Sequence, residues 1–198
     1  MGTIPTRNLA ARRHGFSTIE VVVTLSITLI VASMVVPAAL QAVKNVKLRS
    51  SAGELAGLMQ QARILAAKNN ASPGYPMRFT TLNGAQVAYI DLDGDGAWTT
   101  NEPLVQFGGT VTITLNTPPG AYVLSGDSGG VYPSTTVLGF SPRGLPCPYV
   151  DGPPATCTTP AANYFVYYLT NGESGWAAVV VTKAGRTRVA TWSGTVWK

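Results

Sequence analysis

The chain has 198 residues, of which 45% are hydrophobic and 12% charged, and its formal net charge is +5 with a pI of about 9.4. Such a low charged fraction argues against a disordered chain and against a coiled coil, and the length favours one domain with a sizeable core. The only histidine is His14 and there are two cysteines, so beyond the first fifteen residues no His-based triad, Cys–His pair or His-ligated zinc site can form, and we do not expect an enzyme.

Residues 1–15 form a basic segment in front of a long apolar run. Arg7, Arg12 and Arg13 lie in this segment, and without them the net charge falls to +2, from eleven basic and nine acidic residues. Basic residues beside an apolar run hold that end of the chain in the cytoplasm. The overall basicity is therefore weak support for a nucleic-acid partner.

Residues 16–37 are predicted to form a transmembrane helix. They are mostly apolar, Glu20 is their only charge, and their number matches the roughly 20 residues that cross a hydrocarbon core. A secretory signal has a shorter apolar run with a cleavage site after it, whereas the processing signal here, Arg13-His14-Gly15-Phe16, precedes the run. Cleavage there leaves the helix in place. We predict one pass through the inner membrane, with a periplasmic head.

Four residues of this region, Gly15, Phe16, Glu20 and Pro37, resemble the leader and helix of type IV pilins and type II secretion pseudopilins. The resemblance implies that prepilin peptidase cleaves after Gly15 and methylates Phe16, and that the chain assembles with other pilin subunits. An unpaired carboxylate in a bilayer costs about 2.5–3.5 kcal/mol. The family supplies its partner, the α-amino group of Phe16 on a neighbouring subunit. The alternative is a plain signal anchor with a stray glutamate.

Residues 38–70 are predicted to continue the helix as an amphipathic segment, because apolar residues recur there at helical spacing before Asn69-Asn70. One helix of roughly 54 residues from Phe16 would be about 80 Å long. Its second half would present an apolar stripe to a globular head. Pro37 removes one helical hydrogen bond, so we expect a kink or local melting there.

Residues 75–198 are predicted to form a β-rich head, so the fold class is α+β, with antiparallel sheet on the helix. Short segments rich in Val, Thr, Tyr and Phe alternate with turn residues. The candidate strands are Met77–Leu82, Gln86–Ile90, Leu104–Phe107, Thr110–Leu115, Tyr122–Leu124, Thr136–Phe140, Tyr164–Leu169, Ala177–Thr182 and Thr187–Thr191.

Three short motifs of the head region are similar to those of the GspH/FimT group of minor pilins. They are Gln61-Ala62-Arg63 with the following Leu65-Ala66-Ala67, residues 139–144, and Gly185-Arg186-Thr187-Arg188. The resemblance implies a head of two sheets packed as a β-sandwich. It also implies one of two functions: a structural subunit of a pilus or secretion filament, or a FimT-like receptor that captures DNA.

The segment from Asp91 to Glu102 fits the twelve-residue calcium loop D-x-D-x-D-G-x5-E. Its oxygen ligands would be Asp91, Asp93, Asp95 and Glu102, with the carbonyl of Ala97. Strands rather than helices are predicted on both sides, which is the wrong context for an EF-hand. The alternative is a solvated hairpin turn that needs no metal.

Cys147 and Cys157 lie ten residues apart in a Pro- and Gly-rich segment that is predicted to be outside the inner membrane. Oxidising conditions there favour a disulfide. It would close a loop with little regular structure and contribute about 2–3 kcal/mol through loop entropy.

Lys183, Arg186 and Arg188 form a basic group without an acidic neighbour in sequence after Glu173. In an extended segment Arg186 and Arg188 lie on one face roughly 7 Å apart, a spacing that suits adjacent phosphates. Trp192 and Trp197 would add surface for base stacking. The FimT resemblance implies DNA capture here. The alternatives are a basic hairpin that faces lipid headgroups or neighbouring subunits, or one whose arginines pair with Asp127, Asp151 or Glu173.

Overall fold

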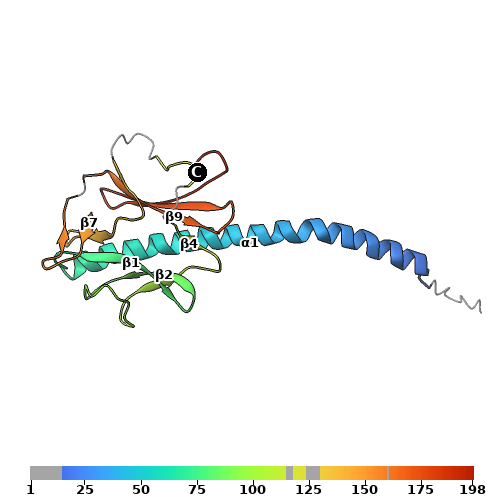
Figure 1. The fold of residues 1–198 in the computed structure, drawn as a ribbon, viewed down its shortest axis with the longest axis horizontal. Coiled ribbons are helices and arrows are strands. Elements are labelled where there is room, and N and C mark those ends of the chain that lie inside the picture. The colour runs from blue at the N-terminus through green and yellow to red at the C-terminus, as the bar shows by residue number, and fades with distance from the viewer. Residues whose placement is uncertain (1–14, 115–117, 124–129, 160) are drawn as a thin grey trace, which may run out of the picture. The chain divides into compact units, whose positions relative to one another are not determined.

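The computed structural model describes residues 15–114, 118–123, 130–159 and 161–198, and it has the α+β fold class that the sequence predicts. Within these residues there are one helix, α1 (Thr18–Lys68), and eleven strands (Figure 1). The chain divides into two compact units, Met1–Gln41 and Ala42–Lys198. The proposed leader, residues 1–15, lies outside the described residues apart from Gly15.

The described part of the first unit is helical from Thr18 onward. Pro37 lies inside α1, and the helix is assigned without a break from Thr18 to Lys68. Of the kink or local melting expected at Pro37, local melting is not seen, because the helix continues through that position. Proline removes its own N–H from the helical ladder and crowds the carbonyl four residues earlier, yet the backbone stays helical on both sides of Pro37.

Helix α1 ends at the asparagines that the sequence marks as its stop. Asn70 has a left-handed φ of 48°, and its N–H donates to the carbonyl of Ala67, while the N–H of Ala71 donates to Ala66. This pair of bonds is the Schellman arrangement, which satisfies the last carbonyls of a helix. It turns the chain directly from α1 into the first strand.

The strands of the second unit form two sheets. Their bounds are β1 (Tyr75–Leu82), β2 (Ala85–Ile90), β3 (Leu104–Gln106), β4 (Thr112–Ile113), β5 (Val131–Tyr132), β6 (Leu138–Phe140), β7 (Pro146–Val150), β8 (Thr156–Cys157), β9 (Tyr164–Thr170), β10 (Trp176–Thr182) and β11 (Thr187–Thr191). One sheet has the order β3-β2-β1-β6-β7-β8 and the other β11-β10-β9-β4, with β5 added beside β9. All pairings are antiparallel except β5 with β9.

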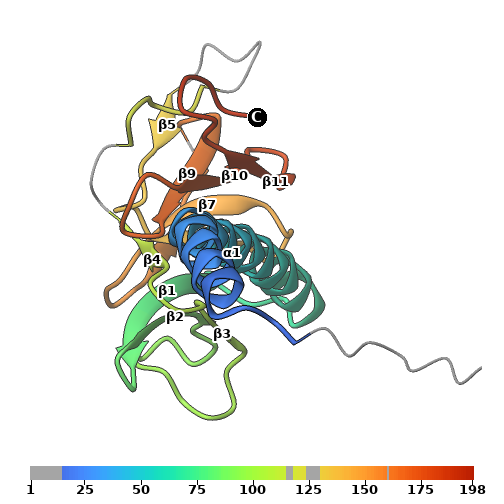
Figure 2. The same cartoon turned by 90° about the vertical axis from the view of Figure 1, so that its right-hand side faces the viewer.

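The second half of α1 lies between the two sheets and forms the centre of the main core (Figure 2). Its buried apolar residues are Leu48, Ala52, Leu55, Leu58, Met59, Ala62 and Ala66. Each sheet contributes large side chains to the same cluster, such as Phe140 from β6 and Tyr167 from β9. The apolar stripe predicted for this half of the helix is therefore confirmed.

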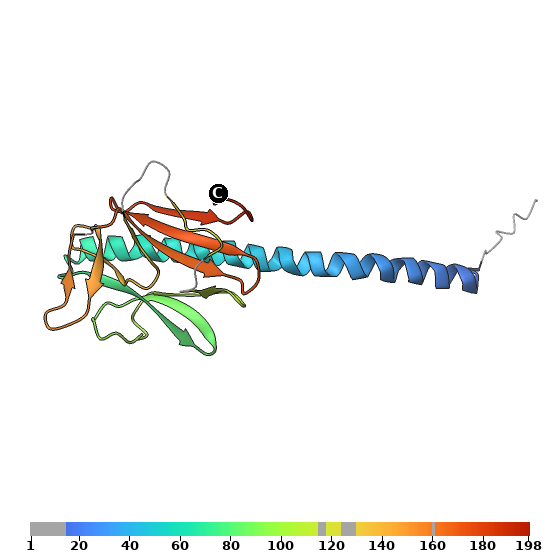
Figure 3. The same cartoon turned by 45° about the horizontal axis from the view of Figure 1, so that its top comes forward.

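Strands β9, β10 and β11 lie side by side in one sheet (Figure 3), and a second, smaller cluster of buried residues lies on its face away from α1. Tyr164, Val166 and Tyr168 alternate along β9 with the residues that face α1, as the period of two in a strand requires. Tyr122 and Trp197 pack against this face and approach each other edge to face. Both faces of the sheet are thus covered in part by apolar side chains.

The structure corrects several predicted strands. Tyr122 and Val123 are not in a strand, while Leu115 and Leu124 lie outside the described residues. Thr110–Leu115 and Thr136–Phe140 are reduced to short strands, and β5, β7 and β8 were missed. Strand β7 begins at Pro146 and contains Pro148, and prolines lack the N–H that a ladder needs. The two prolines therefore argue against a strand in the sequence, but pairing with β6 on one side and β8 on the other maintains it.

Candidate functional site

The described residues of the N-terminal unit form an apolar, exposed helix that is long enough to cross a membrane by length and composition. Hydroxyls in the middle of this helix bond within it: those of Thr24, Ser26 and Thr28 donate to carbonyls three or four residues earlier, at 2.7–3.0 Å. Lipid offers no hydrogen-bonding partner, so a spanning helix needs this internal satisfaction. The helix thus fits a membrane span or a signal anchor.

Glu20 is the exception on this surface. It lies in the first turn of α1, where the helix dipole favours an acid, and Phe16 precedes it with 82% of its surface exposed. In the part of the chain that the structure describes, no ion pair includes Glu20. Within the described residues the Glu20 carboxylate therefore has no basic partner.

The Asp91–Glu102 loop connects β2 to β3, so strands flank it as the sequence predicts. Carboxylate oxygens of Asp91, Asp93 and Asp95 lie within 4.8 Å of one another. The backbone folds onto these oxygens: the N–H groups of Gly94 and Gly96 donate to Asp91 at 2.7 and 3.1 Å. Ala97 donates its N–H to Asp95, at 2.7 Å. The loop is therefore held by its own acidic side chains.

Glu102 does not join this cluster. Its two carboxylate oxygens accept the N–H groups of Leu92 and Thr99, at 2.7 and 2.9 Å, and it is only 5% exposed. The last residue of a calcium loop provides two oxygens to the ion. Here each oxygen already accepts a backbone N–H, so in this arrangement Glu102 is not the two-oxygen ligand that the motif requires, and of the four predicted carboxylates only those of Asp91, Asp93 and Asp95 lie together.

Arg78, which belongs to none of the predicted sites, lies beside this loop. It lies on β1 opposite Tyr89 on β2, and its Nε donates to Asp91 Oδ2 at 2.5 Å. Its terminal nitrogens donate to the carboxylate of Asp151, which directly follows β7. The signal that could have revealed it is that Arg78 is the only charged residue in the eight-residue strand β1.

The charges around Arg78 shift one another's pKa values. The hydrogen bond from Arg78 holds the pKa of Asp151 below its ordinary value. The hydrogen bond to Asp151 raises the pKa of Arg78, burial opposes this, and Asp91 raises it further. Burial, with the negative charge of Asp91, raises the pKa of the Tyr89 phenol. These pKa shifts are those expected of a guanidinium held between two carboxylates.

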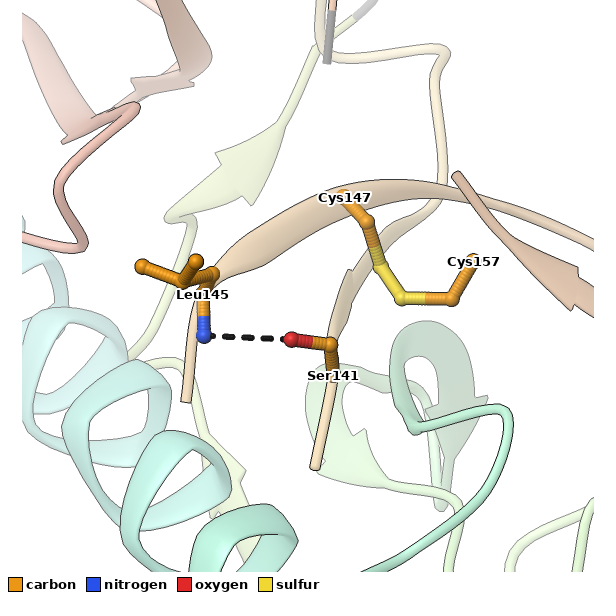
Figure 4. Close-up of a disulfide and its surroundings, with 4 residues drawn as sticks. All are labelled: Ser141, Leu145, Cys147 and Cys157. Carbon is orange, nitrogen blue, oxygen red and sulfur yellow. Dashed lines mark hydrogen bonds between the residues drawn. A yellow bond between two sulfur atoms is a disulfide. The ribbon is translucent and has the colours of Figure 1, made fainter. Parts of the chain in front are cut away.

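Cys147 and Cys157 form the predicted disulfide, with a Cα–Cα distance of 5.4 Å (Figure 4). We expected the disulfide to close a loop with little regular structure. The segment is more regular than that, because the disulfide joins β7 to β8 within an antiparallel hairpin. Beside it the hydroxyl of Ser141 accepts the N–H of Leu145 and fixes the preceding turn. This site is structural.

The predicted basic group lies on the β10–β11 hairpin. Lys183, Arg186 and Arg188 are exposed, and none of them forms an ion pair within the described ranges. Of the acids that could have paired with them, Glu173 binds Lys44 at 2.5 Å and Asp151 binds Arg78, while Asp127 lies outside the described residues. Arg188 is paired with Val180, on the face away from α1.

The structure brings the three GspH/FimT-like motifs together around Arg63. Its guanidinium donates to the carbonyl of Gly185 at 3.1 Å. A Cβ at Gly185, where φ is 78°, would lie 3.1 Å from the guanidinium carbon, and one at Gly144, where φ is 69°, would lie 3.4 Å from Arg63 Cγ. Both turns therefore require glycine to approach the helix. Gln60 completes the contact through a hydrogen bond to Thr187.

No protein-family model, curated protein or solved structure matches this chain.

Proposed function

We propose that this chain is a minor pilin or pseudopilin, a subunit that is held in the inner membrane by the first half of α1 and then transferred into a filament. Three features support the proposal. The processing signal precedes the apolar helix, the helix presents apolar side chains on its surface, and a separate β-rich unit has its own core. Prepilin peptidase and other pilin subunits would be its partners.

Glu20 is the observation that carries the proposal. A carboxylate on an exposed apolar helix is costly in lipid, and among the described residues it has no ion pair. Cleavage after Gly15 would create an α-amino group on Phe16, four positions before Glu20 in sequence. In a filament of parallel helices, the amine of one subunit could neutralise the carboxylate of the next and set their axial register.

The test replaces Glu20 in the full chain within its native host. Glu20→Ala should insert into the membrane normally but decline at least about tenfold in the sheared filament fraction, because the variant no longer gains the roughly 2.5–3.5 kcal/mol that pairing of the carboxylate would recover on assembly. Ser26→Ala, a change in the same helix that leaves the acid in place, is the matched control. Normal recruitment of Glu20→Ala, or assembled subunits that retain residues 1–15 by mass spectrometry, would refute the proposal.

A second function, capture of DNA, is favoured by one observation. Lys183, Arg186 and Arg188 are exposed without an ion pair in the described part of the chain, and two of the acids that could neutralise them are bound elsewhere. Arginines that are free of protein partners remain available for phosphates. The hairpin is held on α1 by Gln60 and Arg63, so its position does not depend on Arg186 or Arg188.

Gel shifts with the detergent-solubilised full chain test this second function. If DNA is bound here, Arg186→Ala/Arg188→Ala should weaken a salt-sensitive shift. The slope of the logarithm of DNA affinity against the logarithm of salt concentration should become shallower by about two, one for each lost phosphate contact. Lys47→Ala/Arg49→Ala removes the same charge from an exposed part of α1 and should leave the shift unchanged. Absence of any shift by the wild type at low salt would remove this function.

A further inference from the structure

We propose that Arg78 is the built-in cation of the Asp91–Glu102 loop, and that it makes a calcium-type loop independent of metal. Asp91 is completely buried, and a buried carboxylate must be neutralised or hydrogen-bonded. Calcium does this in loops of the D-x-D-x-D-G type. Here the guanidinium of Arg78 reaches the same carboxylate from the neighbouring strand, with Nε 2.5 Å from Asp91 Oδ2.

The acceptor positions of Asp91 are largely occupied. Oδ2 accepts from Arg78 and from the N–H of Gly96, and Oδ1 accepts from the N–H of Gly94. An ionised carboxylate offers about four such positions. With three of them filled, and with both oxygens of Glu102 held by backbone N–H groups, the first and last ligands of the motif serve the fold of the loop.

Arg78 is itself held in place by the residues around it. Its side chain is 16% exposed, and it extends from β1 beside Tyr89, whose hydroxyl donates to the carbonyl of Gly96 at 2.8 Å. Asp151, at the end of β7, accepts from both terminal nitrogens. The guanidinium therefore links β1, the acidic loop and the end of β7, three parts of the chain that are distant in sequence.

This assignment has a consequence that a plain solvated turn does not have. Removal of the Arg78 charge leaves buried Asp91 unpaired, with oxygens of Asp93 and Asp95 within 4.8 Å. Three carboxylates at that separation repel one another and attract a divalent cation. The variant Arg78→Met keeps the apolar stem of the side chain. Its thermal stability should therefore depend on calcium, although that of the wild type does not.

The experiment measures thermal unfolding of the full chain in detergent, with EDTA or with about 5 mM calcium, above the roughly 10⁻⁴–10⁻³ M at which extracellular calcium modules dissociate. The wild type should have the same Tm in both. Arg78→Met should lose about 10 °C in EDTA and recover at least half of this loss in calcium. If Arg78→Met cannot be kept folded in EDTA, it is purified in calcium instead. Unfolding of that protein when EDTA is added is then the supporting result.

Two variants and a direct binding probe complete the test. Arg78→Lys keeps a cation and Asp151→Asn removes only the exposed partner, so both should stay insensitive to calcium. Trp98, whose Nε1 donates to the carbonyl of Glu102 at 3.3 Å, can sensitise terbium in the loop, and the signal should saturate in Arg78→Met alone. A Tm of the wild type that rises with calcium, terbium binding by the wild type that Asp95→Asn abolishes, or failure of calcium to rescue Arg78→Met would overturn the proposal.

Discussion

At the scale of single residues, the exposed and the buried acids around Arg78 contribute differently. Asp91 is fully buried, whereas the side chain of Asp151 is 60% exposed although it binds the same guanidinium. Solvent screens a pair of the second kind, and such pairs stabilise a fold by at most about 1 kcal/mol. Asp91 therefore fixes the loop, while Asp151 adds a smaller, pH-dependent contribution.

Asp151→Asn should reveal that contribution. The pKa of Asp151 is lowered from 3.8 by Arg78, so its stabilising effect is fully present above the unfolded value and disappears as pH falls through the lower folded value. The wild type should exceed Asp151→Asn in Tm by about 1–4 °C at neutral pH. Below about pH 4 the two melting temperatures should converge. A gap that stays constant across this range would contradict the shift.

At the scale of elements, the second half of α1 is the part that the fold depends on most. Leu55 and Met59 are fully buried between the two sheets, whereas Ile64 on the same helix is 63% exposed. Burial on both sides means that a shortened side chain leaves a cavity that neither sheet can close alone. The stability of the head is therefore tied to one face of one helix.

Leu55→Ala should lower the free energy of unfolding by about 2–5 kcal/mol, because it removes buried methyl groups and leaves a void. Ile64→Ala, the same kind of truncation at an exposed position of α1, should change it by less than about 0.5 kcal/mol. Denaturant unfolding followed by circular dichroism measures both. Equal losses in the two variants would show that burial does not determine the stability of this helix.

The short strands show where sequence patterns stop being informative. Strands β9 and β10 are rich in Val, Tyr and Ala and buried on both faces, and they were predicted to within two residues. Strand β8 has two residues and β5 has two, too few for any periodicity to be seen. They exist because neighbouring strands, and in β8 the disulfide, provide pairing partners.

At the scale of the whole molecule, the two units differ in how much apolar surface they bury. The main core comes entirely from residues 48–181, within the second unit. The described part of the first unit buries no side chain of its own and exposes large apolar residues from Phe16 to Leu40. Exposed apolar surface of this kind favours lipid or other helices over water, whereas the second unit buries a core of its own.

A fragment of residues 42–198 should therefore fold by itself. We expect it to be a soluble monomer in size-exclusion chromatography, with a Tm within about 3 °C of the full chain in detergent, because it keeps both sheets and every buried residue of the core. Extension of the fragment to residue 16 should restore the need for detergent. An unfolded fragment would mean that the first unit contributes to the stability of the second.

The sequence by itself determined the apolar helix, the amphipathic continuation, the α+β class and the disulfide, because helical spacing, apolar run length and paired cysteines are local signals. Only the tertiary structure decided which carboxylates meet Arg78, that Glu102 faces the backbone, and that Arg63 receives two glycine turns. Those contacts join positions as far as 122 residues apart. They depend on how two sheets close around one helix, and no periodicity within a single segment encodes that geometry.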